Sequence, residues 1–187
     1  MVYIILYLVG GLLFVNGLFL IGQLTDLAGV AAFNFVGGTL ITIMALYIAG
    51  TDMLKAFGET VSNTVGATCL TFAIAYLLIA LEGYSIVRGF EVKGDFVALG
   101  WYCLPMAVCL FLLSLGWFQI LGKQLPKVPQ FGTLWLCWSV CFLLFYLTLA
   151  AKMPVGVFTG WFIMVVGFIT CSYPALANFQ AGKVGKW

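Results

Sequence analysis

Residues 1–25 of the chain read MVYIILYLVGGLLFVNGLFLIGQLT and contain no charged side chain. A bilayer core about 30 Å thick is crossed by roughly 20 apolar residues in a helix, so this stretch is long enough to span a membrane once. Its apolar residues do not alternate with polar ones, as they would in a strand of a membrane barrel. The stretch therefore predicts a spanning helix. Because it has no basic start and no cleavage site, we expect that helix to be retained.

The rest of the chain has the same character. Of its 187 residues, 64% are hydrophobic and 7% are charged, a composition that excludes a water-soluble domain. The few charges separate six charge-free runs, each long enough for one helix, at 1–25, 27–51, 60–81, 96–122, 128–151 and 153–182. We therefore predict one all-α transmembrane domain over residues 1–187. Its six helices are expected at about 2–24, 28–50, 62–86, 96–121, 131–151 and 154–179.

The connections between these runs are short, so consecutive helices must be antiparallel. We expect three antiparallel hairpins, formed by the first and second, the third and fourth, and the fifth and sixth helices. No connection is large enough to fold as a separate domain, so any function must lie within the bundle or at its rims.

Composition also excludes several functional classes. The eight Lys and Arg residues are scattered singly, which argues against a nucleic-acid partner. The chain has no His and no clustered catalytic residues, so we expect no catalytic site, no metal site and no cofactor. The six cysteines all fall inside predicted spans, where free thiols behave as small apolar side chains: Cys69, Cys103, Cys109, Cys137, Cys141 and Cys171.

A polar side chain inside a span must face protein or water. Asn16 lies in the middle of the first span and is the main candidate for a pore-lining residue. The alternative is that its amide bonds to a neighbouring helix, and both can hold at once. Glu82 ends the third span, where it is either an interfacial residue or part of a vestibule. The other polar residues inside spans are Asn34, Gln119, Thr170, Ser172 and Asn178.

Aromatic residues give the fifth span a broad aromatic surface around Trp135 and Trp138. This surface is a candidate pore wall, and the alternative is an interfacial aromatic belt. Ring faces suit small neutral polar solutes, whereas hydrated ions need charges or rings of carbonyl groups. Glycines in the first two spans predict close helix packing at Gly10, Gly17, Gly37 and Gly38.

An ordered set of segments resembles the amide and urea channel family AmiS/UreI. These segments are YLVGGLLFVNGLFLIG at 7–22, VAAFNFVGG at 30–38, FAIAYLLIA around Tyr76, GWYCL at 100–104, LWLCWSVCF at 134–142, MPVGVFTGWF at 153–162 and TCSYP at 170–174. The resemblance covers nearly the whole chain. It implies a six-helix bundle in the bacterial cytoplasmic membrane, assembled as a homohexamer among membrane lipids. Each protomer would hold a pore that passes short-chain amides or urea down their gradient, without chemistry on the solute.

The resemblance also implies site residues: Asn16, Tyr76, Trp135, Trp138, Phe142 and Trp161 are expected to line the pore or bind the permeant. Three positions depart from urea channels. Val166 replaces an acidic residue, Leu78 an aromatic one and Phe142 a tryptophan. These departures favour a solute less polar than urea, and they leave an accessory subunit of a larger complex as the alternative function. Without histidine, gating by imidazole is absent and an open pore is expected.

Overall fold

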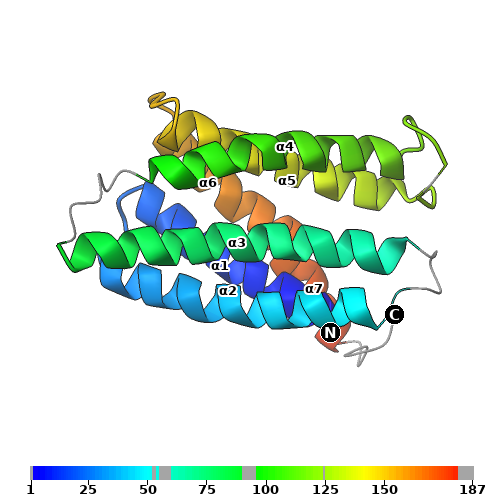
Figure 1. The fold of residues 1–187 in the computed structure, drawn as a ribbon, viewed down its shortest axis with the longest axis horizontal. Helices are drawn as coiled ribbons and strands as arrows, with labels where there is room; N and C mark the ends of the chain where they lie inside the picture. Colours follow the sequence, from blue (N-terminus) through cyan, green and yellow to red (C-terminus); the bar gives the residue numbers. More distant parts are fainter. Residues whose placement is uncertain (1, 52–53, 55–59, 90–95, 124, 181–187) are drawn as a thin grey trace.

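The computed structural model describes residues 2–51, 54, 60–89, 96–123 and 125–180, and within these ranges every regular element is a helix. Each of the six spans is long and apolar enough to cross a membrane. The predicted all-α bundle of six transmembrane helices is therefore confirmed. Its elements, shown in Figure 1, are α1 (Val2–Leu20), α2 (Leu27–Gly50), α3 (Val61–Val87), α4 (Val97–Trp117), α5 (Pro129–Leu149) and a sixth span made of α6 (Gly156–Gly167), the π-helix η2 (Phe168–Ser172) and α7 (Tyr173–Gln180).

Two helix starts follow directly from the local sequence. Asp26 caps α2, because its carboxylate accepts a hydrogen bond from the backbone N–H of Gly29 at 3.0 Å. Helix α5 begins at Pro129, whose missing N–H costs nothing in the first turn of a helix.

The sixth span is not a regular α-helix. Within η2 the hydrogen bonds skip one residue more than in an α-helix, as shown by the backbone N–H of Tyr173, which bonds to the carbonyl of Phe168. Pro174 follows, and it has no N–H with which to continue an α-helical ladder and crowds the preceding turn. The wider turn therefore ends two residues before Pro174, which disfavours regular α-helical bonding.

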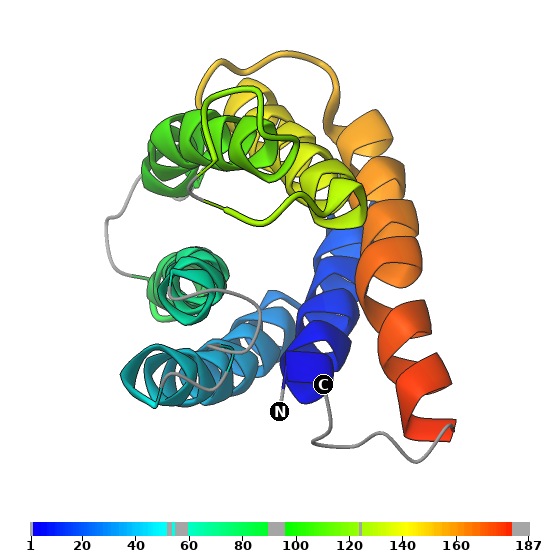
Figure 2. The same ribbon diagram turned by 90° about the vertical axis from the view of Figure 1, so that its right-hand side faces the viewer.

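The six spans form a ring in chain order when they are viewed end-on (Figure 2). Three pairs make the most extensive contacts, namely α2 with α3, α4 with α5, and α1 with the sixth span. Contacts between α3 and α4 and between α5 and α6 are sparse. The spans of each expected hairpin are in contact and antiparallel, and the closest packing lies one step further along the chain. Short loops force neighbouring helices to be antiparallel, but they do not decide which neighbours pack most closely.

Glycines explain where the backbones come closest. A Cβ atom built on Gly17 in α1 would lie 2.7 Å from the carbonyl oxygen of Gly160 in α6, and one on Gly160 would lie 2.8 Å from that of Gly17. Between α4 and α5, a Cβ on Gly100 would lie 2.7 Å from the backbone nitrogen of Ala150. These contacts are backbone against backbone and leave no room for a side chain.

The four glycines singled out in the sequence all lie at helix contacts. A Cβ on Gly10 would collide with Ser172, and one on Gly37 would lie 2.6 Å from the side chain of Leu12. A Cβ on Gly38 would lie 3.2 Å from the carbonyl oxygen of Ala73, between α2 and α3.

Candidate functional site

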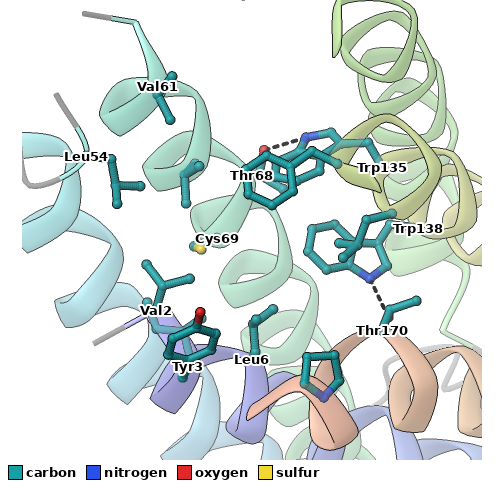
Figure 3. A pocket seen from close by; sticks show the side chains of 15 residues that line it. Val2, Tyr3, Leu6, Leu54, Val61, Thr68, Cys69, Trp135, Trp138 and Thr170 are labelled. Atoms are coloured by element: carbon teal, nitrogen blue, oxygen red, sulfur yellow. Dashed lines mark hydrogen bonds between the residues drawn. The ribbon is translucent and has the colours of Figure 1, made fainter. Parts of the chain in front are cut away.

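A cavity of about 390 Å³ opens into the bundle at the end where α1, α3 and α5 begin (Figure 3). Apolar side chains such as Ile5, Val65 and Leu134 form most of its wall. The cavity also reaches the side chains of Thr68, Cys69, Trp135, Trp138 and Thr170, which Figure 3 shows around the same space.

Two much smaller voids follow. One of about 10 Å³ is lined by residues that include Phe72, Tyr76 and Phe142, and one of about 30 Å³ by residues that include Asn16 and Phe145. Helices α1, α3 and α5 run in the same direction (Figure 1). The lining residues advance together along these helices, so the three spaces follow one another through the bundle. A single water needs roughly 10–15 Å³. The spaces beyond the large cavity are thus about the size of one or two water molecules.

Aromatic rings separate the large cavity from the small voids. Phe72 lies at the centre of this group, with its ring edge-on to Trp138 at 5.0 Å and to Phe142 at 5.1 Å between ring centroids. The ring of Tyr76 lies 6.2 Å from that of Phe72, and its hydroxyl donates to the carbonyl of Val9 in α1 at 3.3 Å. Edge-to-face pairs at these distances are favourable. The cluster therefore closes the middle of the bundle with rings and holds them in defined orientations.

Trp135 and Trp138 connect α5 to two other spans. The indole N–H of Trp135 donates to the hydroxyl oxygen of Thr68 in α3 at 3.1 Å, and that of Trp138 to Thr170 in η2 at 3.2 Å. Both hydrogen bonds are visible in Figure 3. The centroids of the two indole rings lie 5.1 Å apart, and both side chains are almost fully buried. Four of the expected pore residues, Tyr76, Trp135, Trp138 and Phe142, are thus brought together.

Asn16 lies beside the 30 Å³ void and bonds to another helix. Its amide exchanges two hydrogen bonds with Asn34 of α2, at 2.9 and 2.8 Å, and Asn34 also donates to the carbonyl of Val30 at 2.8 Å. Both asparagines are buried. The structure thus shows the interhelical bond that was one interpretation of Asn16, while the same residue lines the 30 Å³ void.

The sequence matches the profile of the AmiS/UreI family transporters over residues 1–181. The chain belongs to the AmiS/UreI transporter family. This membership confirms the resemblance noted in the sequence, and it confirms that the protein is a transporter and not an enzyme. Together with the six spans, it also shows a multi-pass membrane protein.

Individual AmiS/UreI relatives resemble the chain over most of their length. It is 29% identical to a protein of Rhodococcus erythropolis described as transporter AmiS2, over 89% of this chain and 73% of that protein. It is 27% identical to an amidate substrates transporter protein of Mycolicibacterium smegmatis, over 96% of this chain and 78% of that protein. The crystal structure of the urea channel of Helicobacter pylori superposes with a TM-score of 0.73, at 25% identity, over 97% of this chain and 99% of that one.

Other residues singled out in the sequence lie away from the cluster. Trp161 is 58% exposed on the outer surface of α6, so it does not join the other expected pore residues. Glu82 accepts a hydrogen bond from the backbone N–H of Leu99 at 3.1 Å, in the first turn of α4. All six cysteines are free thiols, and no group of three metal-binding side chains occurs among the residues that the structure describes.

Sequence reasoning missed two residues of this AmiS/UreI site. Phe72, the hub of the ring cluster, is one of 17 phenylalanines in an apolar chain and carries no distinguishing signal. Thr68 was also missed, because a threonine can satisfy its hydroxyl on its own helix and so gives no indication of a partner. Thr170 had been noted as polar within a span, but its tryptophan partner could be seen only in the structure.

Proposed function

We propose that this AmiS/UreI protein is a passive channel for short-chain aliphatic amides or urea in the bacterial cytoplasmic membrane. The observation that carries the proposal is a pathway lined by apolar and aromatic side chains. None of the described residues lining the 390 Å³ cavity or the two voids beyond it is charged. Such walls give a hydrated ion nothing to replace its water shell, whereas a small planar neutral solute can pass along ring faces.

The names of the relatives support the same solutes. The Mycolicibacterium smegmatis relative is described by its amidate substrates, and the Helicobacter pylori structure is a urea channel. Passive transport fits this lining, because proton relays in transporters use chains of Asp, Glu or His, and none of these occurs among the described residues that line the three spaces. The accessory-subunit alternative has no observation in its favour.

We further propose that the functional unit is a homo-oligomer, with six protomers as the resemblance to the family implies. Large apolar side chains such as Phe35, Ile43 and Trp161 are more than half exposed on the single chain. Lipid or neighbouring protomers must cover such a surface. Native mass spectrometry of the protein in detergent or lipid would measure the number of protomers.

Stopped-flow light scattering of reconstituted liposomes tests the transport proposal. We expect re-swelling in acetamide and urea to be faster than in empty liposomes, with glycerol much slower than either. Equal rates with and without folded, inserted protein would overturn the proposal.

A further inference from the structure

The threonine hydroxyl groups that accept from the two tryptophans also donate, each to a backbone carbonyl group of its own span. Thr68 donates its hydroxyl hydrogen to the carbonyl of Thr64 at 2.9 Å, and Thr170 donates to the carbonyl of Val166 at 2.7 Å. A threonine hydroxyl has only one hydrogen to give. Its oxygen is therefore left as an acceptor, so each indole N–H meets a fixed acceptor.

The two threonines hold the rings from different sides of the interior. Helix α3 is not a ring neighbour of α5, so the side chain of Trp135 reaches across the bundle to Thr68 (Figures 2 and 3). Trp138 reaches instead to Thr170 in the sixth span. The paired indole rings thus lie between the 390 Å³ cavity and the voids beyond it.

Both indole N–H groups are removed from the reach of a solute by these bonds. In apolar surroundings, breaking such a bond leaves a donor without a partner, which is costly. A solute that enters the cavity therefore meets the faces and edges of the rings of Trp135 and Trp138. A solute carbonyl group finds no free indole donor there that would retain it.

We propose that Thr68 and Thr170 are positioning residues that keep solute binding in the pathway weak by occupying the indole N–H groups of Trp135 and Trp138. This inference rests on the proposed transport of amides or urea. Removing the Thr68 hydroxyl frees the indole N–H of Trp135, and removing the Thr170 hydroxyl leaves that of Trp138 with only the weakly accepting thiol of Cys171. The released donor then binds the carbonyl oxygen of a passing amide.

The test is the concentration dependence of acetamide flux in liposomes containing Thr68→Val or Thr170→Val. Valine keeps the shape of threonine and removes the acceptor. The half-saturating concentration of acetamide is expected to fall about two- to ten-fold, which corresponds to the net free energy of one hydrogen bond. The maximal flux is expected to fall as well, because the solute leaves the site more slowly. Thr68→Ser and Thr170→Ser keep the hydroxyl and should restore the wild-type half-saturation.

A matched control separates positioning from stability. Thr71, on the same helix as Thr68, also donates its hydroxyl to a backbone carbonyl, that of Ala67, and it is not part of the cavity lining. Thr71→Val should leave the half-saturating concentration unchanged. A purely structural role for Thr68 or Thr170 would lower the maximal flux with the amount of folded protein and leave half-saturation unaltered, which would overturn the proposal.

A double-mutant cycle and fluorescence complete the test. In a Trp138→Phe background, Thr170→Val should have no further effect on half-saturation, because its partner is gone. An undiminished effect there would overturn the inference.

The same variants are compared by tryptophan emission, which needs no transport. If the wild-type protein passes no amide, the proposed function fails. An emission change in Thr170→Val that is absent with Trp138→Phe would then still establish the hydrogen bond, and an unchanged spectrum would refute it.

Discussion

The two halves of the pathway differ in width and in how their helices are held. The half at the N-terminal ends of α1, α3 and α5 contains a cavity of about 390 Å³, whereas the voids of the other half measure about 10 and 30 Å³. In the narrow half α1 is tied to α2 by the Asn16–Asn34 amide pair and packs against α6 through Gly17 and Gly160. Close glycine contacts occur in the wide half as well, at Gly66, so small residues alone do not set the width. The buried amide pair is particular to the narrow half, and aromatic rings divide that half from the wide one.

The largest effect is expected from removing the division between the halves. Trp138→Ala deletes a ring that packs on both Trp135 and Phe72, so the two halves should merge and glycerol should re-swell liposomes almost as fast as acetamide. The lost burial costs about 3–5 kcal/mol of folding free energy, so folded protein must be quantified first. Trp161→Ala on the outer surface serves as the control. Unchanged discrimination against glycerol in Trp138→Ala would contradict the role of the rings.

The next effect concerns the close approach of α1 and α6 in the narrow half. Gly17→Ala places a methyl group against the backbone of Gly160, which cannot yield as a flexible side chain would. We expect a loss of about 1–3 kcal/mol in unfolding free energy, measured by denaturation in detergent. Gly11→Ala is the matched control, because nothing lies within 4 Å of a Cβ at that position. A similar loss in both variants would argue against the contact.

A smaller effect is expected at the asparagine pair. Asn16→Leu leaves the side-chain oxygen and one N–H of the buried Asn34 amide without a partner, while its bond to the carbonyl of Val30 remains. We expect a loss of about 0.6–2 kcal/mol in unfolding free energy, the range for polar contacts between membrane helices. Adding Asn34→Leu should recover part of that loss, because no unpaired amide remains at the pair. Additive losses in the double variant would show that the two amides do not depend on each other. Slower acetamide flux in Asn16→Leu would in addition place this residue in the pathway.

The smallest effect is expected from thiol labelling, which compares how far water-soluble reagents reach into the wide and the narrow half. Cys69 lines the wide cavity, whereas Cys141 lines the 10 Å³ void beyond the rings. A small water-soluble thiol reagent should label Cys69 slowly and reduce acetamide flux, while leaving Cys141 unmodified. Mass spectrometry identifies the labelled thiols, and Cys69→Ser should remove the inhibition. Equal labelling of both cysteines would mean that the narrow half is open to water.

Much of the architecture could be predicted because it depends on composition. The sparse charges separate the six spans, and the aromatic residues of the fifth span indicate one wall of the site. Partners on different helices could not be predicted. Asn16 and Asn34 were each noted as polar residues within a span, but one sequence does not give the rotation of α1 against α2 that joins them. The same holds for Trp138 and Thr170, which are 32 residues apart.

The π-helix has a consequence for insertions and deletions. A π-turn is geometrically an α-helix with one additional residue. Deleting one residue within Phe168–Ser172 would replace the wider turn by an α-helical one, with Pro174 still interrupting the backbone hydrogen bonds. The residues after it would keep their facing. A one-residue deletion in the middle of α5 would instead rotate all later side chains of that helix by roughly 100°. The segment that carries Thr170 can thus lose a residue with less change to the facing of later side chains than the middle of α5 can.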